Sequence, residues 1–130
     1  IPASRVLSFL ASYLPSRRYS GAASDWYEAL WQVAGNHRVL FEDFGWNRRW
    51  GKNPWCSEVD QWLTKLHGII WILDLGGTKW FQFPSEWLEF HRLLEGRVSA
   101  QAKEELQKAA QELSQLLPSA PLLVEESPRS

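Results

Sequence analysis

The sequence predicts an α+β fold, in which a small antiparallel sheet (about 38–46, 68–75 and 78–83) packs with several helices, including a long C-terminal one. Two observations lead to this expectation. Apolar residues recur at intervals of three and four in several segments, as on the buried face of a helix. Between 68 and 83, two short apolar runs flank Gly76-Gly77, which can adopt the positive φ angles of a two-residue hairpin turn.

The chain is expected to begin with two helices. Pro15 ends the first, whose apolar stripe is Leu7, Leu10, Ala11 and Leu14. The second is expected to open at Asp25, whose spacing to Glu28 resembles a capping box, and to close at Gly35-Asn36. Its apolar face consists of Trp26, Ala29, Leu30 and Val33.

The segment RVLFEDFGW (38–46) is expected to be the first strand, although its apolar and polar residues alternate imperfectly. A loop over 44–55 follows, punctuated by glycine and proline. Ser57 and Asp60 have the spacing of a helix cap, which predicts a third helix ending near Gly68. Its apolar stripe is Val59, Trp62, Leu63 and Leu66.

The clearest unit of the chain is a hairpin that runs into a helix. GIIWILDL (68–75) is continuously apolar up to Asp74, as expected of a strand covered on both faces. Truncating Trp71 to Ala is therefore expected to cost about 3–5 kcal/mol of unfolding free energy. TKWFQF (78–83) is the expected partner strand, and a helix starts after Pro84. The apolar residues of this helix are Trp87, Phe90 and Leu94.

Ser99 is expected to open a last, longer helix that reaches Leu117. Its apolar positions form a narrow seam that suits one other helix: Ala102, Leu106, Ala109, Leu113 and Leu116. Packing of this seam within the chain is favoured, and a homodimer through helix 99–117 stays an open alternative. Residues 1–117 are expected to form a single globular domain, and 118–130 a flexible C-terminal tail.

The composition is unusual in its tryptophans, which number nine among 130 residues. Each indole brings a large apolar surface and one N–H that needs a partner. A net charge of −1 and a pI near 6.3 give no overall attraction to phosphate polymers. Residues 1–55 carry seven Lys and Arg against four Asp and Glu, whereas 56–130 carry seven against eleven. An anion site is therefore expected in the first half.

Residues that could carry catalysis or bind metal are sparse. Cys56 is the only cysteine, so an intrachain disulfide is excluded and an intracellular compartment is weakly favoured. His37, His67 and His91 lack the short paired spacing of zinc sites. No run approaches the roughly 18 apolar residues of a membrane span. We therefore expect no catalytic, cofactor-binding or metal-binding residue, no membrane contact, and a protein that is not an enzyme.

The segment DLGGTK (74–79) resembles the first phosphate loop of the sugar-kinase, hexokinase and actin-like ATPase superfamily. In that superfamily an Asp ends the first strand, and a glycine turn lets backbone amides approach the phosphates of ATP. The resemblance implies such roles for Asp74, Gly76, Gly77 and Thr78. A phosphate-binding enzyme fragment is therefore a third function class, behind the two that follow.

The hairpin with the following PSEWLEFHRLL (84–94) resembles the sheet-to-helix step of Whirly- and PUR-type single-stranded nucleic-acid binders. In those families a strand runs into a helix with an aromatic residue and a leucine on its inner face. The resemblance implies that Trp87, Phe90 and Leu94 face the sheet, and it supports an α+β architecture.

The segment WNRRWGKNPW (46–55) combines three tryptophans with three cationic residues, and its candidate binding residues are Trp46, Arg48, Arg49, Trp50, Lys52 and Trp55. Trp and Arg are enriched at the hot spots of protein interfaces. We therefore expect a non-catalytic interaction module that binds a protein partner through this loop. Two alternatives stay open: the indoles stack on the bases of single-stranded RNA or DNA while the cations neutralise phosphates, or the rings lie in the core.

Overall fold

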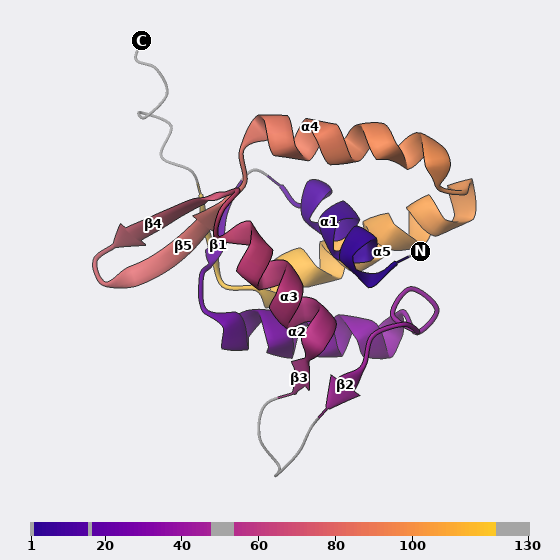
Figure 1. Ribbon diagram of the computed structural model, residues 1–130, viewed down its shortest axis with the longest axis horizontal. Coiled ribbons are helices and arrows are strands. Elements are labelled where there is room, and N and C mark those ends of the chain that lie inside the picture. Colours follow the sequence, from indigo (N-terminus) through magenta and orange to yellow (C-terminus); the bar gives the residue numbers. More distant parts are fainter. Residues whose placement is uncertain (1, 16, 48–53, 122–130) are drawn as a thin grey trace.

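The computed structural model describes residues 2–15, 17–47 and 54–121 (Figure 1). Within these ranges the chain forms helices and small antiparallel sheets, which confirms the α+β class. The elements in chain order are α1 (Ala3–Ser12), β1 (Arg17–Ser20), α2 (Ala23–Asn36), β2 (Trp46–Asn47), β3 (Trp55–Cys56), α3 (Ser57–Leu66), β4 (Trp71–Leu75), β5 (Thr78–Gln82), α4 (Ser85–Leu93), the 3-10 helix η2 (Leu94–Arg97), α5 (Ala100–Leu116) and β6 (Ser119–Pro121).

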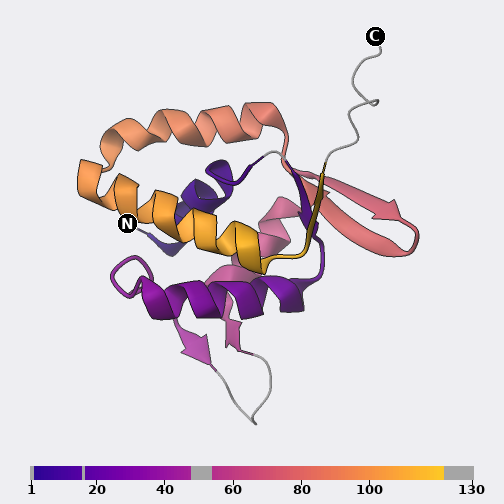
Figure 2. The same cartoon turned by 180° about the vertical axis from the view of Figure 1, so that it is seen from behind.

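The helices enclose the core. Helix α5 packs against α1 and α2, and α3 packs against α1 (Figure 2). Two tryptophans lie in this core, Trp26 of α2 and Trp62 of α3, with ring centroids 5.7 Å apart. Trp26 Nε1 donates to the carbonyl oxygen of Ser20 at 2.6 Å, and Trp62 Nε1 donates to Ser8 Oγ at 3.1 Å. Both indoles are therefore buried with their single donor satisfied.

Strand β1 is not predicted by the sequence pattern, and it lies inside the four-stranded sheet of order β4-β5-β1-β6. Its sequence RRYS has no apolar alternation, so nothing local marks it as a strand. Tyr19 pairs with Phe81 of β5, and both side chains are buried. The chain then passes so close to β5 at Gly21 that a Cβ there would lie 3.0 Å from the carbonyl oxygen of Lys79.

The hairpin of β4 and β5 is confirmed, with an unbroken register from Trp71–Gln82 to Leu75–Thr78. Gly76 and Gly77 have φ angles of 62° and 84°, as a two-residue turn requires. The expectation that this strand is covered on both faces is wrong, because Trp71 is 57% exposed. The hairpin extends beyond the helices in both views, so none of the described elements covers its outer part (Figures 1 and 2).

The predicted strand over 38–46 is also wrong, except for its last residue. Residues 38–43 form successive turns, in which Phe41 N–H donates to the carbonyl of Arg38 and Phe44 N–H to that of Phe41. Phe41 and Phe44 are buried with ring centroids 4.6 Å apart. Apolar residues three apart share one side of a turn, whereas a strand would place them on opposite faces.

The predicted helices are all present, and their caps differ in part from the expectation. Helix α2 starts at Ala23, before the expected capping box. The hydroxyl of Ser20 accepts from Ala22 N–H at 3.0 Å and donates to Asp25, which holds the residues before the helix in place. The hydroxyl of Ser99 accepts from Ala102 N–H at 3.1 Å, which confirms Ser99 as the N-cap of α5.

Three of the five apolar seam positions of α5 pack within the chain, whereas Leu116 is exposed. Leu106, Ala109 and Leu113 are buried where α5 contacts α1 and α2. These side chains are therefore unavailable for the homodimer seam considered from the sequence. Beyond α5, β6 pairs with β1, so the sheet extends into the segment expected to be a tail. The rest of that segment, 122–130, lies outside the described residues.

Candidate functional site

Strands β2 and β3 form the root of the tryptophan-rich loop. Trp46 pairs with Cys56, and Asn47 pairs with Trp55. Trp46 is half-buried, whereas Trp55 is 45% exposed. The other four candidate binding residues, Arg48, Arg49, Trp50 and Lys52, lie outside the described residues. The structure therefore positions the two ends of the predicted site.

The Glu58 carboxylate holds the two strands of this root together. Its Oε1 accepts from Gly45 N–H at 2.9 Å and from the Cys56 thiol at 3.1 Å. These hydrogen bonds, that from Gly45 first, hold the pKa of Glu58 below its ordinary value. Burial raises the pKa of the Cys56 thiol to about 11, so the thiol stays protonated at neutral pH. A nucleophilic role for Cys56 is not supported.

Trp46 belongs to an aromatic cluster that the sequence pattern does not predict. Its ring makes an edge-to-face contact with Trp31 of α2, at a centroid distance of 5.4 Å and an interplanar angle of 76°. It also stacks on Phe44, at 6.4 Å and 13°. Both contacts are typical geometries for aromatic pairs. Trp46 is therefore oriented by its neighbours rather than displayed alone.

An open groove of about 460 Å³ lies beside this cluster, and we call it the aromatic groove. Its lining residues are Trp31, Gln32, Ala34, Gly35, Arg38, Phe41 and Trp46. Arg38 is exposed, and no acidic side chain pairs with it among the described residues. The groove thus combines two indoles, one phenyl ring and one guanidinium. One signal could have pointed to it: Trp31 lies outside the apolar face Trp26, Ala29, Leu30 and Val33 of its helix.

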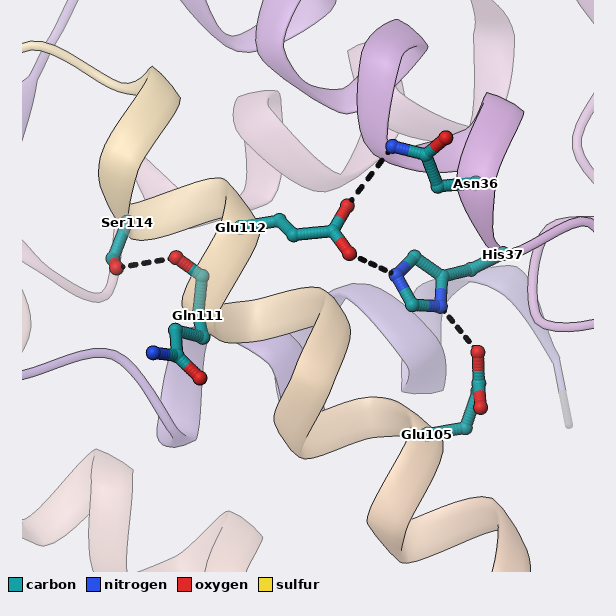
Figure 3. Close-up of polar contacts among 6 residues, drawn as sticks. All are labelled: Asn36, His37, Glu105, Gln111, Glu112 and Ser114. Atoms are coloured by element: carbon teal, nitrogen blue, oxygen red, sulfur yellow. Dashed lines mark hydrogen bonds and ion pairs between the residues drawn. The ribbon is translucent and has the colours of Figure 1, made fainter.

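His37 is buried at the C-terminal end of α2, next to α5. The buried ring lies between two carboxylates of α5: Nδ1 contacts Glu105, and Nε2 lies 2.7 Å from Glu112 Oε2 (Figure 3). Asn36 also donates to Glu112, at 3.2 Å. Burial opposes the charged imidazolium, but the hydrogen bonds and charges of Glu112 and Glu105 outweigh it and raise the pKa of His37. This cluster joins α2 to α5.

The other two histidines have separate environments. His67 directly follows α3, and its Nδ1 lies 2.8 Å from the carbonyl oxygen of Leu63 in that helix. His91 is half-buried against Trp87, and burial followed by the positive charge of Arg5 lowers its pKa. Among the described residues, no group of three His, Cys, Asp or Glu side chains could hold a metal ion.

The two family resemblances point to residues with ordinary structural roles. Gly76 and Gly77 form the hairpin turn, with Asp74 and Thr78 on either side of it. In α4, Phe90 is 58% exposed, so the expectation that it faces the sheet is wrong. Trp87 and Leu94 are partly buried against the core, on the side where α4 packs against α1.

Comparison with protein-family models, with curated proteins and with solved structures finds no match. Of the helices that the structure describes, none is both long and apolar enough to cross a lipid bilayer. The geometry of the surface is therefore the basis on which a function can be assigned.

Proposed function

We propose that this chain is a non-catalytic interaction module that binds a protein partner through the 44–55 loop and the aromatic groove beside it. The observation that supports the proposal is the groove, because Trp31, Trp46 and Arg38 line one open hollow at the root of the loop. Trp and Arg are the residue types that contribute most to protein interfaces. Trp55, exposed on the other strand of the root, extends the same kind of surface.

The groove favours a particular kind of partner segment. Its rings offer an apolar surface, and Arg38 is a cation without an acidic partner among the described residues. A short segment with an apolar side chain next to an Asp or Glu would meet both features. A guanidinium can bind such a carboxylate through two parallel hydrogen bonds.

Single-stranded nucleic acid is the second candidate, because indoles and guanidinium groups also suit bases and phosphates. Two observations favour protein. Trp46 already contacts Trp31 and Phe44, so its faces are partly used within the chain. The net charge of −1 gives no long-range attraction to a polyanion. The phosphate-loop resemblance at 74–79 makes a phosphate-binding enzyme fragment the third candidate.

The proposal can be tested with a random peptide library displayed on phage and selected against the native chain. We expect the selected peptides to carry an apolar residue beside an acidic one. A labelled selected peptide should bind Arg38→Glu about tenfold or more weakly than the wild type, as expected when a charge-assisted contact is lost. Arg97→Glu is the matched control, since Arg97 is exposed and does not line the groove.

A titration with a labelled mixed-sequence single-stranded oligonucleotide distinguishes the second candidate. Tight binding that weakens steeply with added salt and is lost in Arg38→Glu would replace the protein proposal with the nucleic-acid one. Selected peptides that bind both charge-reversal variants as well as the wild type would contradict a role for the groove.

A further inference from the structure

Strand β4 is an unprotected edge of the four-stranded sheet, since β5 is its only partner among the described residues. Proteins usually block such edges with charged side chains, lysine above all, with proline or with a bulge. The sequence of β4, WILDL, contains neither lysine nor proline, its one charged residue, Asp74, lies across from Lys79, and its register with β5 is continuous. The other edge strand, β6, has three residues and ends in Pro121. The two edges therefore differ in their capacity to pair.

The turn determines which backbone groups of β4 point outward. In a two-residue hairpin, the residues that flank the turn exchange hydrogen bonds, and pairs that do and do not exchange them then alternate along the strands. Leu75 and Thr78 are the flanking pair. The backbone N–H and C=O groups of Leu73 and Leu75 therefore point toward β5. The backbone N–H and C=O groups of Ile72 and Asp74 point to the open side of β4.

Side chains on one face of β4 are apolar throughout. Trp71, Leu73 and Leu75 share this face because alternate residues of a strand point the same way. Trp71 and Leu75 are 57% and 44% exposed, although an apolar strand face is normally covered. Ile72, on the opposite face, is 38% exposed. The hairpin also extends clear of the helices, so another strand can approach the edge (Figure 1).

We propose that the β4 edge pairs with β4 of a second copy of this chain, antiparallel and with the two-fold axis at Leu73. This register places Ile72 opposite Asp74 of the other copy, so the outward backbone groups of both residues form hydrogen bonds. Leu73 then faces its own counterpart, and Trp71 faces Leu75 of the second copy. All apolar residues on this face of β4 meet apolar residues, which is the self-complementarity that a two-fold interface requires.

The charges are compatible with this pairing. Asp74 is the only ionisable side chain of β4, and the two-fold register does not place it directly opposite its counterpart. Within each hairpin, Asp74 lies directly across from Lys79. The two paired hairpins therefore bring together two acids and two bases, without net charge.

The mass of the protein in solution tests the proposal, measured by light scattering over a range of concentrations. The wild type should reach the mass of two copies, whereas Leu75→Lys should remain a monomer because a lysine blocks the edge. Leu93→Lys is the matched control: it makes the same change at an exposed leucine of α4 and should leave the dimer intact. A wild type that stays monomeric, or a dimer that Leu75→Lys leaves unchanged, would overturn the proposal.

Cysteine cross-linking tests the register. A residue on the axis lies roughly 4.5 Å from its counterpart between Cα atoms, which is within the range of a disulfide. Under mild oxidation, Leu73→Cys should therefore form a covalent dimer at least tenfold faster than Asp74→Cys. The native Cys56 is fully buried and does not interfere. Equal rates for the two variants would exclude this register. Because Arg38 is not part of the β4 edge, Arg38→Glu should leave dimerisation unchanged even if it abolishes peptide binding.

Discussion

His37 shows how one side chain can join two distant parts of the chain. It follows α2 directly, and both of its ring nitrogens meet glutamates of α5. A neutral imidazole carries only one N–H, so it can donate to only one of the two carboxylates. The imidazolium donates to both. The fold therefore stabilises the protonated form, which explains why the pKa of His37 is raised.

This arrangement predicts a pH-dependent stability. Because the folded state raises the pKa of His37 above its ordinary value of 6.5, its contribution is fully present below that value and is lost as pH rises through the folded-state pKa. The free energy of unfolding in urea should therefore decline over this range in the wild type. In His37→Gln it should be lower by about 1–3 kcal/mol on the acidic side, with this decline absent. An unchanged pH slope in the variant would contradict the assignment.

At the scale of elements, the exposure of a tryptophan depends on whether neighbouring elements cover it. Trp26 of α2 is buried against Trp62, Phe81 and Phe83. Trp71 of β4 lies on the uncovered part of the sheet. Truncation should therefore have very different effects at the two positions, although both were expected to be core from their apolar surroundings in the sequence.

Trp26→Ala should lower the free energy of unfolding by about 3–5 kcal/mol, the usual loss for a large buried aromatic side chain. Trp71→Ala should lower it by less than about 1 kcal/mol in the monomer, as for other surface substitutions. Urea denaturation followed by circular dichroism compares the two variants without depending on tryptophan emission. Equal losses would mean that the outer face of β4 is covered in solution.

The sequence predicted those elements whose signals are local. Each helix shows an apolar stripe within its own residues, and Gly76-Gly77 marks the hairpin directly. Strand β1 has no such signal, because its identity as a strand depends on partners far along the chain. The exposure of Trp71 depends on where the helical layer ends, and a run of apolar residues does not indicate this position.

Part of the candidate site can also be predicted from local sequence, and part of it cannot. Trp46 and Trp55 could be named from their local composition. Arg38 and Phe41 join the groove only because residues 38–43 fold into turns rather than the expected strand. Trp31 meets Trp46 through a contact between α2 and β2 that only the tertiary structure shows.

At the scale of the whole molecule, β6 ties the C-terminal part of the described chain to its N-terminal part. It adds three register pairs to β1, and the carbonyl of Pro118 accepts from Ser20 N–H at 2.9 Å. A chain that ends at Leu117 should therefore be less stable than one that ends at Pro121, by about 2–4 kcal/mol for the backbone hydrogen bonds lost. Thermal unfolding of the two truncated chains measures this difference. Identical midpoints would show that β6 contributes nothing to stability.

The central position of β1 has a consequence for how the protein folds. Its partners β5 and β6 both belong to the second half of the chain, so the pairings of Tyr19 with Phe81 and with Ser119 close very long loops. Closing such loops costs entropy before any contact compensates for it, and a high contact order slows folding. During synthesis on the ribosome, Tyr19 lacks its β5 partner until Phe81 has emerged, and it lacks its β6 partner until almost all of the described sequence has emerged. We therefore expect the helices and the local β4–β5 hairpin to form early, and the pairings of β1 with β5 and β6 to be the last and slowest part to assemble.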